Sequence, residues 1–326
     1  MTTIAITGAA GFIGTHVSEM LLSRGDTVVG LDNFNDFYDP AIKRANAKHL
    51  QRWEGFRLVE GDIQSPESLD AVLGSGDVDA IIHLAARAGV RPSVEDPSLY
   101  ADVNVRGTIQ VLEAAVRYGI ERFVFASSSS VYGANTKTPF HEEDPVELPE
   151  SPYAATKRAG ELLCRTYHHL YATTGPLQSL AVLRFFTVYG PGQRPEMAIS
   201  KFTKRMIQGQ TIPMFGDGSS LRDYTYVDDI VAGVVAALDR SQGYRIFNLG
   251  GGQPVRLDAM IAAVAKAVGV EPVIEELPMQ PGDVQVTVSD CSRAREELGY
   301  LPQTSLNDGI SEYVKWHMMN RHDSDR

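Results

Sequence analysis

The chain has 326 residues, 43% of them hydrophobic and 22% charged, which is enough for one large domain or two intimate domains with a full core. Its net charge of −11 argues against non-specific binding to nucleic acid or to an anionic membrane, but it allows a locally basic pocket for an anionic small molecule. Two cysteines, no charged leader and no long apolar run predict a cytoplasmic protein with free thiols, not a secreted or membrane protein.

The first predicted unit is a strand, a glycine-rich turn, a helix and a second strand. Residues 2–7 form an apolar, β-branched run, and residues 27–31 form another that is closed by Asp32. Glycines in the turn would let the backbone approach a pyrophosphate, which would then sit on the helix N-terminus. The Asp32 carboxylate could bind a ribose and would repel a 2′-phosphate, so the sequence favours NAD over NADP. The turn residues expected at the cofactor are Gly8, Gly11, Phe12, Ile13 and Gly14.

The glycine spacing and a later tyrosine–lysine pair together resemble one enzyme family. The glycines follow the pattern Gly-x-x-Gly-x-x-Gly from Gly8 to Gly14, and Tyr153 and Lys157 form a Tyr-x-x-x-Lys pair. This combination resembles the extended short-chain dehydrogenase/reductase family. Residues 33–46 (NFNDFYDPAIKRAN) are similar to the corresponding loop of its UDP-glucuronate 4-epimerases. The resemblance covers nearly the whole chain and implies an α/β fold, with a Rossmann-like doubly wound parallel sheet that carries NAD.

Two further strands are predicted over residues 56–59 and 80–84. The resemblance implies that Asp62, after the third strand, lies at the adenine, whereas composition alone would make it a helix cap. Small residues after the fourth strand leave room for a cofactor. Arg87 follows them and could face phosphates or a sugar carboxylate, or could be solvated. Other residues that the resemblance places at the cofactor are Asn33, Ile63, Leu84, Ala85, Ala86 and Asn104.

A serine-rich segment follows the fifth predicted strand, residues 123–126. A serine hydroxyl at this strand end can hydrogen-bond the substrate oxygen that loses its proton. Counted from the Val-Tyr-Gly motif that follows, Ser128 matches the catalytic serine of the family, and Ser127 is the neighbouring candidate. The sequence leaves open which of the two is the main catalytic hydroxyl.

Ser129 and Ser130 stand where relatives with other reactions carry acidic residues. The family's 4,6-dehydratases place Thr-Asp-Glu in this region, and its UDP-glucuronate decarboxylases place a glutamate just before Val-Tyr-Gly. Acid–base work at C5 or C6 of a sugar needs a titratable group within hydrogen-bond reach. The serines therefore favour epimerisation at C4, with Ser129 expected at the substrate.

The tyrosine–lysine pair lies on a helix that is predicted to begin with Ser151 as N-cap and Pro152 as its first residue. On such a helix Tyr153 and Lys157 are one turn apart on the same face. A phenol with a pKa near 10 is a poor base at neutral pH. A nearby lysine ammonium and a positively charged nicotinamide would favour the phenolate, which makes Tyr153 the expected catalytic base.

Thr187 and Arg194 follow a sixth predicted strand, residues 180–186. They resemble the threonine and arginine of uronate epimerases, whereas galactose-type 4-epimerases usually have asparagine near the threonine position. A hydroxyl and a bidentate guanidinium would suit a C6 carboxylate. The alternative interpretation is that Arg194 is only a surface loop charge.

The resemblance places two later segments at the nucleotide. Residues 215–224 contain a glycine-rich turn that ends in Arg-Asp-Tyr, so Arg222 is expected at the diphosphate and Phe215 on the uracil ring. A segment that contains Asp283 resembles the part of the family that covers the nucleotide, and Asp283 is expected at the substrate. Galactose-type enzymes carry an arginine where this chain has Gln280.

The chain is expected to form two domains and a homodimer. The NAD-binding domain is expected over residues 1–186 and about 225–250, and the nucleotide-sugar domain over residues 187–224 and 251–326. Residues 244–249 predict a seventh strand that returns to the main sheet. The homodimer is implied by resemblance alone, because the helix predicted from about residue 97 to 118 and the Tyr153 helix often form a four-helix bundle between subunits in the family.

The predicted reaction is the NAD-dependent interconversion of UDP-glucuronate and UDP-galacturonate through a 4-keto sugar. Alternatives are a UDP-glucose/galactose 4-epimerase, a UDP-glucuronate decarboxylase and a non-catalytic NAD(H)-sensing regulator. The intact set of Tyr153, Lys157 and Ser128 argues against the regulator. No metal site is predicted, because the eight histidines show no recognised ligand spacing.

Overall fold

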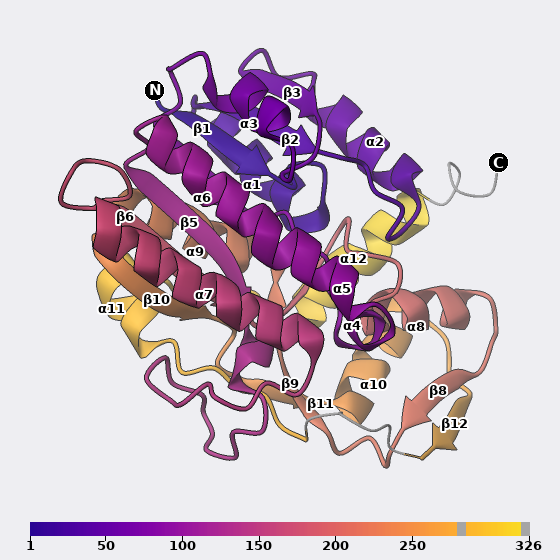
Figure 1. Cartoon of the computed structure of the whole chain (residues 1–326). Helices are drawn as coiled ribbons and strands as arrows, with labels where there is room; N and C mark the ends of the chain where they lie inside the picture. Colours follow the sequence, from indigo (N-terminus) through magenta and orange to yellow (C-terminus); the bar gives the residue numbers. More distant parts are fainter. Residues whose placement is uncertain (279–284, 321–326) are drawn as a thin grey trace.

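A seven-stranded parallel sheet forms the centre of the computed structural model, which describes residues 1–278 and 285–320 (Figure 1). The order of its strands is β10-β6-β5-β4-β1-β2-β3. The strands are β1 (Thr3–Thr7), β2 (Thr27–Asp32), β3 (Phe56–Glu60), β4 (Ala80–His83), β5 (Arg122–Ser128), β6 (Ser179–Phe185) and β10 (Gly243–Leu249). The predicted doubly wound sheet is confirmed, and the strand expected over residues 244–249 does join it beside β6.

Helices cover both faces of this sheet (Figure 1). They are α1 (Phe12–Ser23), α2 (Pro40–Leu50), α3 (Pro66–Leu73), α6 (Gly107–Arg117), α7 (Pro152–Tyr171) and α9 (Val227–Arg240). Side chains alternate across each strand, so Ile4 and Ile6 of β1 pack in the cluster that contains α1 and α9 residues, whereas Ala5 packs with α3 and α6. Strands buried on both faces explain the nearly continuous apolar runs of the sequence.

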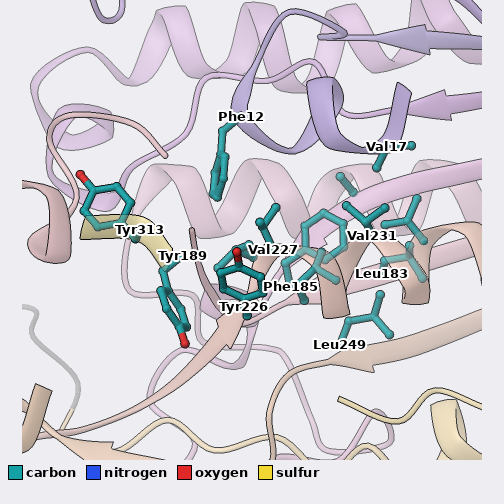
Figure 2. Close-up of a cluster of buried hydrophobic side chains, with 14 of the residues drawn as sticks. Phe12, Val17, Leu183, Phe185, Tyr189, Tyr226, Val227, Val231, Leu249 and Tyr313 are labelled. Atoms are coloured by element: carbon teal, nitrogen blue, oxygen red, sulfur yellow. The ribbon is translucent and has the colours of Figure 1, made fainter. Parts of the chain in front are cut away.

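A layer of apolar side chains fixes α1 against the sheet (Figure 2). Phe12 and Val17 of α1 meet Val227 and Val231 of α9, and Leu183 of β6 lies in the same cluster. Phe12 is the first residue of α1 and is 7% exposed. The N-terminus of α1 is therefore anchored by packing at the carboxyl edge of the sheet.

The long helix expected from about residue 97 to 118 is interrupted. The chain forms α4 (Val90–Glu95), α5 (Pro97–Ala101), a π-helical turn (Asp102–Arg106) and then α6. The predicted bounds of the helical segment are confirmed. The prediction of one regular α-helix was wrong at Asn104, which lies in the π-helical turn. Such turns occur often at functional sites because they re-aim a side chain without ending the helix.

Two small sheets and the remaining helices follow β6 in the sequence. Their bounds are β7 (Thr187–Tyr189), α8 (Ala198–Ile207), β8 (Ile212–Phe215), β9 (Leu221–Tyr226), β11 (Pro254–Arg256), α10 (Leu257–Val268), β12 (Ile274–Leu277), α11 (Ser292–Leu298) and α12 (Leu306–Met319). One sheet has the order β11-β9-β7 and the other pairs β12 with β8. The helix expected from residue 255 begins at Leu257, because residues 254–256 pair with β9 instead. Within residues 1–278 and 285–320, each helix is too short or too polar to cross a membrane.

Candidate active site

A cavity of about 420 Å³ opens at the carboxyl ends of the central strands. It lies where the strand order reverses, between β1 and β4, which is the usual ligand position in a doubly wound sheet. Most of the predicted site residues meet on its wall, although they are far apart in sequence. Those that line it are Gly8, Gly11, Phe12, Ile13, Gly14, Asp32, Asn33, Asp62, Ile63, Leu84, Ala85, Ala86, Ser127, Ser128, Ser129, Tyr153, Lys157, Thr187 and Arg194.

The glycine-rich turn between β1 and α1 forms a cradle that larger residues would fill. Gly8 has a φ of +73°, and a Cβ at Gly14 would lie 2.1 Å from the Gly8 carbonyl oxygen. Gly11 is the N-cap of α1 and provides no side-chain cap. The first amide groups of α1, which lack intrahelical partners, can therefore bind a pyrophosphate through the backbone. These residues fit the phosphates of a dinucleotide such as NAD.

Asp32 is held in place at the end of β2 by backbone amides. Its carboxylate accepts hydrogen bonds from the Ala10 amide (3.1 Å) and the Phe34 amide (2.9 Å). Burial raises the pKa of Asp32, and these hydrogen bonds oppose that rise. The Lys43 ammonium lies 4.0 Å away and was not foreseen from the sequence. A fixed carboxylate on the cavity wall suits a ribose, as the sequence predicted.

The cavity wall has a second polar pair. The Asn33 amide donates a 2.7 Å hydrogen bond to Asp62, and both residues line the cavity. Asp62 also accepts from the backbone amide of Gln64 at 2.8 Å. Asp62 therefore lines the cavity and caps the turn at Gln64, whereas the N-cap of α3 is Ser65, so the helix-cap interpretation of Asp62 is wrong. Its contact with adenine stays a prediction.

Tyr153 is the second residue of α7, and its position follows from the local helix start. Ser151 accepts a 3.1 Å hydrogen bond from the Ala154 amide, so the predicted N-cap is confirmed. Burial raises the pKa of Tyr153, while a hydrogen bond with Ser128 and the charge of Arg194 oppose the rise. The phenol is therefore protonated at neutral pH in this state, and its ionisation requires further positive charge in the cavity.

Lys157 lies one turn further along α7 and is almost completely buried. Its ammonium donates a 2.8 Å hydrogen bond to the Ala126 carbonyl on β5. Burial lowers the pKa of Lys157 to about 8. The lysine is therefore mostly charged at neutral pH, and its position is set by the strand beside it.

The two candidate serines have different partners. Ser127 donates a 2.6 Å hydrogen bond to Glu161, whereas Ser128 accepts from the Ser130 amide at 3.2 Å and hydrogen-bonds Tyr153. Ser127 is 3% exposed. The geometry therefore directs Ser128 towards the tyrosine and Ser127 towards a buried carboxylate.

Glu161 and Arg184 form a buried ion pair beneath the serines, which the sequence analysis missed. Arg184 donates to both carboxylate oxygens at 2.9 Å, and the two side chains are 1% and 0% exposed. Burial raises the pKa of Glu161, but the hydrogen bonds and charge of Arg184 outweigh this effect and hold the pKa below its usual value. Glu161 continues the four-residue spacing of Tyr153 and Lys157 along α7, and this spacing is the signal that could have identified it.

Asn104 supports the cavity wall from behind and does not line it. It is 2% exposed, accepts from the Arg87 amide at 2.8 Å and donates to Thr156 at 3.0 Å. Its amide therefore joins the loop after β4 to α7. The contact expected between Asn104 and a cofactor stays a prediction.

A chain of polar contacts continues below the cavity to His83 at the end of β4. Its ring nitrogens contact the hydroxyls of Thr7 (2.7 Å) and Thr108 (3.1 Å). Thr108 donates its own proton to the Asn104 carbonyl, so the histidine donates to Thr108 and accepts from Thr7. Burial lowers the pKa of His83 to about 3. The ring is therefore neutral and fully hydrogen-bonded.

The loop between β2 and α2 connects two of the predicted substrate arginines. The guanidinium of Arg194 lies 5.6 Å from the ring centre of Phe37, and that of Arg87 lies 5.7 Å from it. Arg87 is also 3.7 Å from Asp36, and Arg194 is 3.2 Å from Glu196. Arg194 and Thr187 both line the cavity, whereas Arg87 does not line it but lies near Phe37, which does.

Phe215 and Arg222, two of the remaining predicted substrate residues, lie outside the described cavity wall. Phe215 ends β8, and the guanidinium of Arg91 lies 5.7 Å from its ring centre. Arg222 lies in β9, where it donates a 3.0 Å hydrogen bond to the carbonyl of Leu221. Asp283 lies outside the described residues. The roles expected of these three residues at the nucleotide stay predictions.

Carboxylates on the described cavity wall are confined to Asp32 and Asp62. Asp32 ends β2, and Tyr153 lies beside β5, three strand spacings or roughly 14 Å away across the sheet. The described residues contain no group of three histidine, cysteine or acidic side chains that could hold a metal. The described wall near Tyr153 therefore offers hydroxyl and cationic side chains.

The chain resembles known proteins over almost its whole length. The model of the NAD dependent epimerase/dehydratase family matches residues 4–250. A UDP-glucuronate 4-epimerase of Thermodesulfobacterium geofontis is 42% identical over 97% of this chain and 96% of its own. The structure of UDP-glucuronic acid 4-epimerase from Bacillus cereus, in complex with UDP-glucuronic acid and NAD, has a TM-score of 0.89 and 35% identity, covering 98% of this chain and 99% of its own.

The same backbone also serves another reaction. A dTDP-glucose 4,6-dehydratase from Streptomyces venezuelae, with NAD bound, has a TM-score of 0.90 and 32% identity, and the match covers 98% of each chain. The fold therefore does not decide the reaction by itself, and the side chains on the cavity wall must do so.

Proposed function

The chain belongs to the NAD-dependent epimerase/dehydratase family, and from this premise we propose that it interconverts UDP-glucuronate and UDP-galacturonate. The observation that carries the proposal is a single cavity wall that combines Tyr153, Ser128, Thr187 and Arg194. This wall offers a proton acceptor and two side chains that could bind a carboxylate, and its described part has no acidic side chain near Tyr153 that could drive dehydration. Relatives that share 42% of their residues with this chain carry the same named activity.

Tyr153 holds and moves the proton of the sugar C4 hydroxyl. NAD⁺, which the turn from Gly8 to Gly14 and Asp32 would hold, would supply reversible hydride transfer at C4. Ser128, which hydrogen-bonds Tyr153, orients the same hydroxyl. Because burial raises the pKa of the phenol, the positive charges of Lys157 and Arg194 are needed to make proton removal favourable at neutral pH.

Thr187 and Arg194 bind the C6 carboxylate in this proposal. Both line the cavity wall that also holds Tyr153. Oxidation at C4 creates a β-keto acid, which readily loses CO₂ when its C5–carboxylate bond aligns with the carbonyl π system. A hydroxyl and a fixed guanidinium that hold the carboxylate out of this alignment suppress the loss. The same two residues therefore distinguish an epimerase from a decarboxylase.

Incubation of purified protein with UDP-glucuronate, without added cofactor, tests the proposal. Products are separated by chromatography and identified by NMR. A mixture of UDP-glucuronate and UDP-galacturonate supports both the reaction and tightly held NAD. UDP-pentose as the main product would indicate a decarboxylase, and conversion of UDP-glucose alone would indicate a hexose epimerase. Absence of turnover with any of these sugars, in protein that contains NAD, would favour an NAD(H)-sensing regulator.

We further propose a homodimer formed through α6 and α7. These helices lie side by side on the outside of the sheet (Figure 1). Leu162 and Leu170 of α7 are 50% and 57% exposed, which leaves apolar surface on a helix that would otherwise face water. Light scattering of the wild type should give twice the chain mass of 35.6 kDa. The double variant Leu162→Glu, Leu170→Glu should be monomeric.

The division into an NAD-binding and a nucleotide-sugar part belongs to the same proposal. Residues that follow β6, among them Thr187 and Arg194, complete a wall that the turns of the main sheet begin. A cytoplasmic location agrees with Cys164 and Cys291, which are both free and buried. Fractionation of cells that produce the protein would test this location directly.

A further inference from the structure

Glu196 is a charged residue beside the proposed site whose arrangement is unusual. Its side chain as a whole is 38% exposed, yet both carboxylate oxygens are buried and have no hydrogen-bond partner among the described residues. A buried carboxylate without hydrogen bonds is costly, so a nearby positive charge must stabilise it. That charge is Arg194, whose Nη1 atom lies 3.2 Å from Oε1 of Glu196.

The contact between these two residues is an ion pair without hydrogen-bond geometry. A guanidinium has five N–H donors in a planar fork, and it binds a carboxylate most strongly when two of them are used in parallel. The guanidinium of Arg194 also lies 5.6 Å from the ring centre of Phe37. The arginine is thus held near Glu196 while its donors are not consumed by it.

Arg194 faces two possible carboxylates. Glu196 lies 3.2 Å from it, and the cavity that Arg194 lines could admit the carboxylate of a sugar. Two carboxylates that share one guanidinium repel each other, and in a partly buried site this repulsion is screened less than in water. Glu196 must therefore weaken the binding of a uronate while leaving a neutral sugar unaffected.

We propose that Glu196 is a specificity-determining residue that competes with the sugar carboxylate for Arg194. When the sugar carboxylate dissociates from Arg194, Glu196 pairs with the guanidinium again. The inference rests on the proposed function. Epimerisation requires the oxidised sugar to turn over within the site, so its carboxylate must release Arg194 and be bound again. An internal carboxylate that holds the arginine in the interval lowers the cost of that release.

The test compares Glu196→Gln with the wild type, both loaded with NAD. Calorimetric titration with UDP-glucuronate should show roughly ten-fold tighter binding to the variant, because one negative charge beside Arg194 is gone. Titration with UDP-glucose, which lacks the carboxylate, should differ less than two-fold. With UDP-glucuronate, kcat and KM should both fall, because the substrate is held more tightly and turns over more slowly.

Two matched variants control the experiment. Glu297→Gln removes the same charge from an exposed pair with Arg245 and should change neither titration. In an Arg194→Gln background, Glu196→Gln should no longer tighten the binding of UDP-glucuronate, because its target is absent. Thermal unfolding of each variant establishes that the compared proteins are folded.

Three results would overturn the proposal. Weaker or unchanged binding of UDP-glucuronate by Glu196→Gln would mean that Glu196 only orients Arg194 or does nothing. Equal tightening for UDP-glucose would mean that Arg194 binds the diphosphate and not the sugar carboxylate. If the wild type neither binds nor converts UDP-glucuronate, the proposed function itself fails and this inference fails with it, whereas the first two results leave that function intact.

Discussion

Ser127 donates its hydroxyl hydrogen to Oε1 of Glu161 over 2.6 Å, so the first of the two adjacent serines is engaged by a buried carboxylate. Ser128 is left to hydrogen-bond Tyr153. Two neighbouring residues of the same type thus act on opposite sides of one strand, as the alternation of side chains along β5 requires. The contacts therefore favour Ser128 as the catalytic hydroxyl and Ser127 as a supporting residue.

Replacement of each serine by alanine should separate these roles. Ser128→Ala should lower kcat by about ten- to a hundred-fold, because a hydrogen bond to the reacting oxygen is lost, and should lower the free energy of unfolding by only about 1 kcal/mol, because the Ser130 amide loses its cap. Ser127→Ala should change kcat only a few-fold but lower the free energy of unfolding by about 1–3 kcal/mol, because Glu161 loses a buried hydrogen bond. Steady-state kinetics and urea unfolding measure the two effects. Equal losses of kcat in both variants would contradict the assignment.

The Glu161–Arg184 pair should dominate the stability of this region. Arg184→Met leaves a carboxylate buried without its main partner and should lower the free energy of unfolding by about 3–5 kcal/mol. Adding Glu161→Gln should recover part of this loss. The exposed pair of Arg245 and Glu297 serves as the control, and Arg245→Met should cost less than about 1 kcal/mol. Similar losses for the two arginines would show that burial of the first pair is energetically unimportant.

Tyr153→Phe should stop the proton transfer and leave the fold unchanged, because the ring packs as before and only the hydroxyl is removed. We expect kcat with UDP-glucuronate to fall by roughly 10²- to 10⁴-fold. The amount of NAD that copurifies with the variant, measured after acid release, should match the wild type. A variant that keeps its turnover would exclude Tyr153 as the base.

Stability should depend on pH through His83. Burial lowers its pKa to about 3, from an ordinary value of 6.5. Between these two pH values His83 is protonated in the unfolded chain but neutral in the folded protein. The free energy of unfolding therefore falls as the pH falls, and His83 contributes up to about 1.4 kcal/mol per pH unit to this change. Urea unfolding at pH 7, 6 and 5, with NAD held constant, measures the slope.

The matched variant for that slope is His83→Gln, which keeps a side-chain donor and acceptor between Thr7 and Thr108. Acidic groups also titrate at low pH, so the prediction concerns the difference between the two proteins. The wild type should lose more stability than the variant between pH 7 and 5. Parallel curves would mean that His83 becomes protonated without unfolding.

Much of the cofactor side of the site could be predicted because it lies in turns after strands. Gly8, Asp32, Leu84 and Ser128 each follow an apolar run, and parallel strands bring their carboxyl ends to one edge of the sheet. The strand pattern therefore placed these residues together before any side-chain contact was known. The return of residues 244–249 to the sheet was predictable from a short run that contains Ile246, Phe247 and Leu249.

The residues that the sequence did not reveal depend on contacts between distant segments. Arg184 stands in an otherwise apolar strand, and its carboxylate partner is on a helix, so neither position signals the pair alone. The π-helical turn at Asn104 has no distinctive composition. Arg222 matched a family motif, yet its guanidinium contacts the Leu221 carbonyl and lies off the described cavity wall. A sequence motif can identify which residue type is present, but tertiary packing determines which groups its side chain contacts.

The order in which the sheet is completed has a consequence for how the protein can be made. β6 pairs with β5 and with β10, and β10 follows only after the chain has formed β7, β8 and β9. Because the chain is synthesised from its N-terminus, one edge of the buried strand β6 stays unpaired until residue 249 has left the ribosome. An open apolar edge recruits other chains. The cofactor-binding part is thus not a detachable module, and a fragment that stops at residue 186 should aggregate during expression.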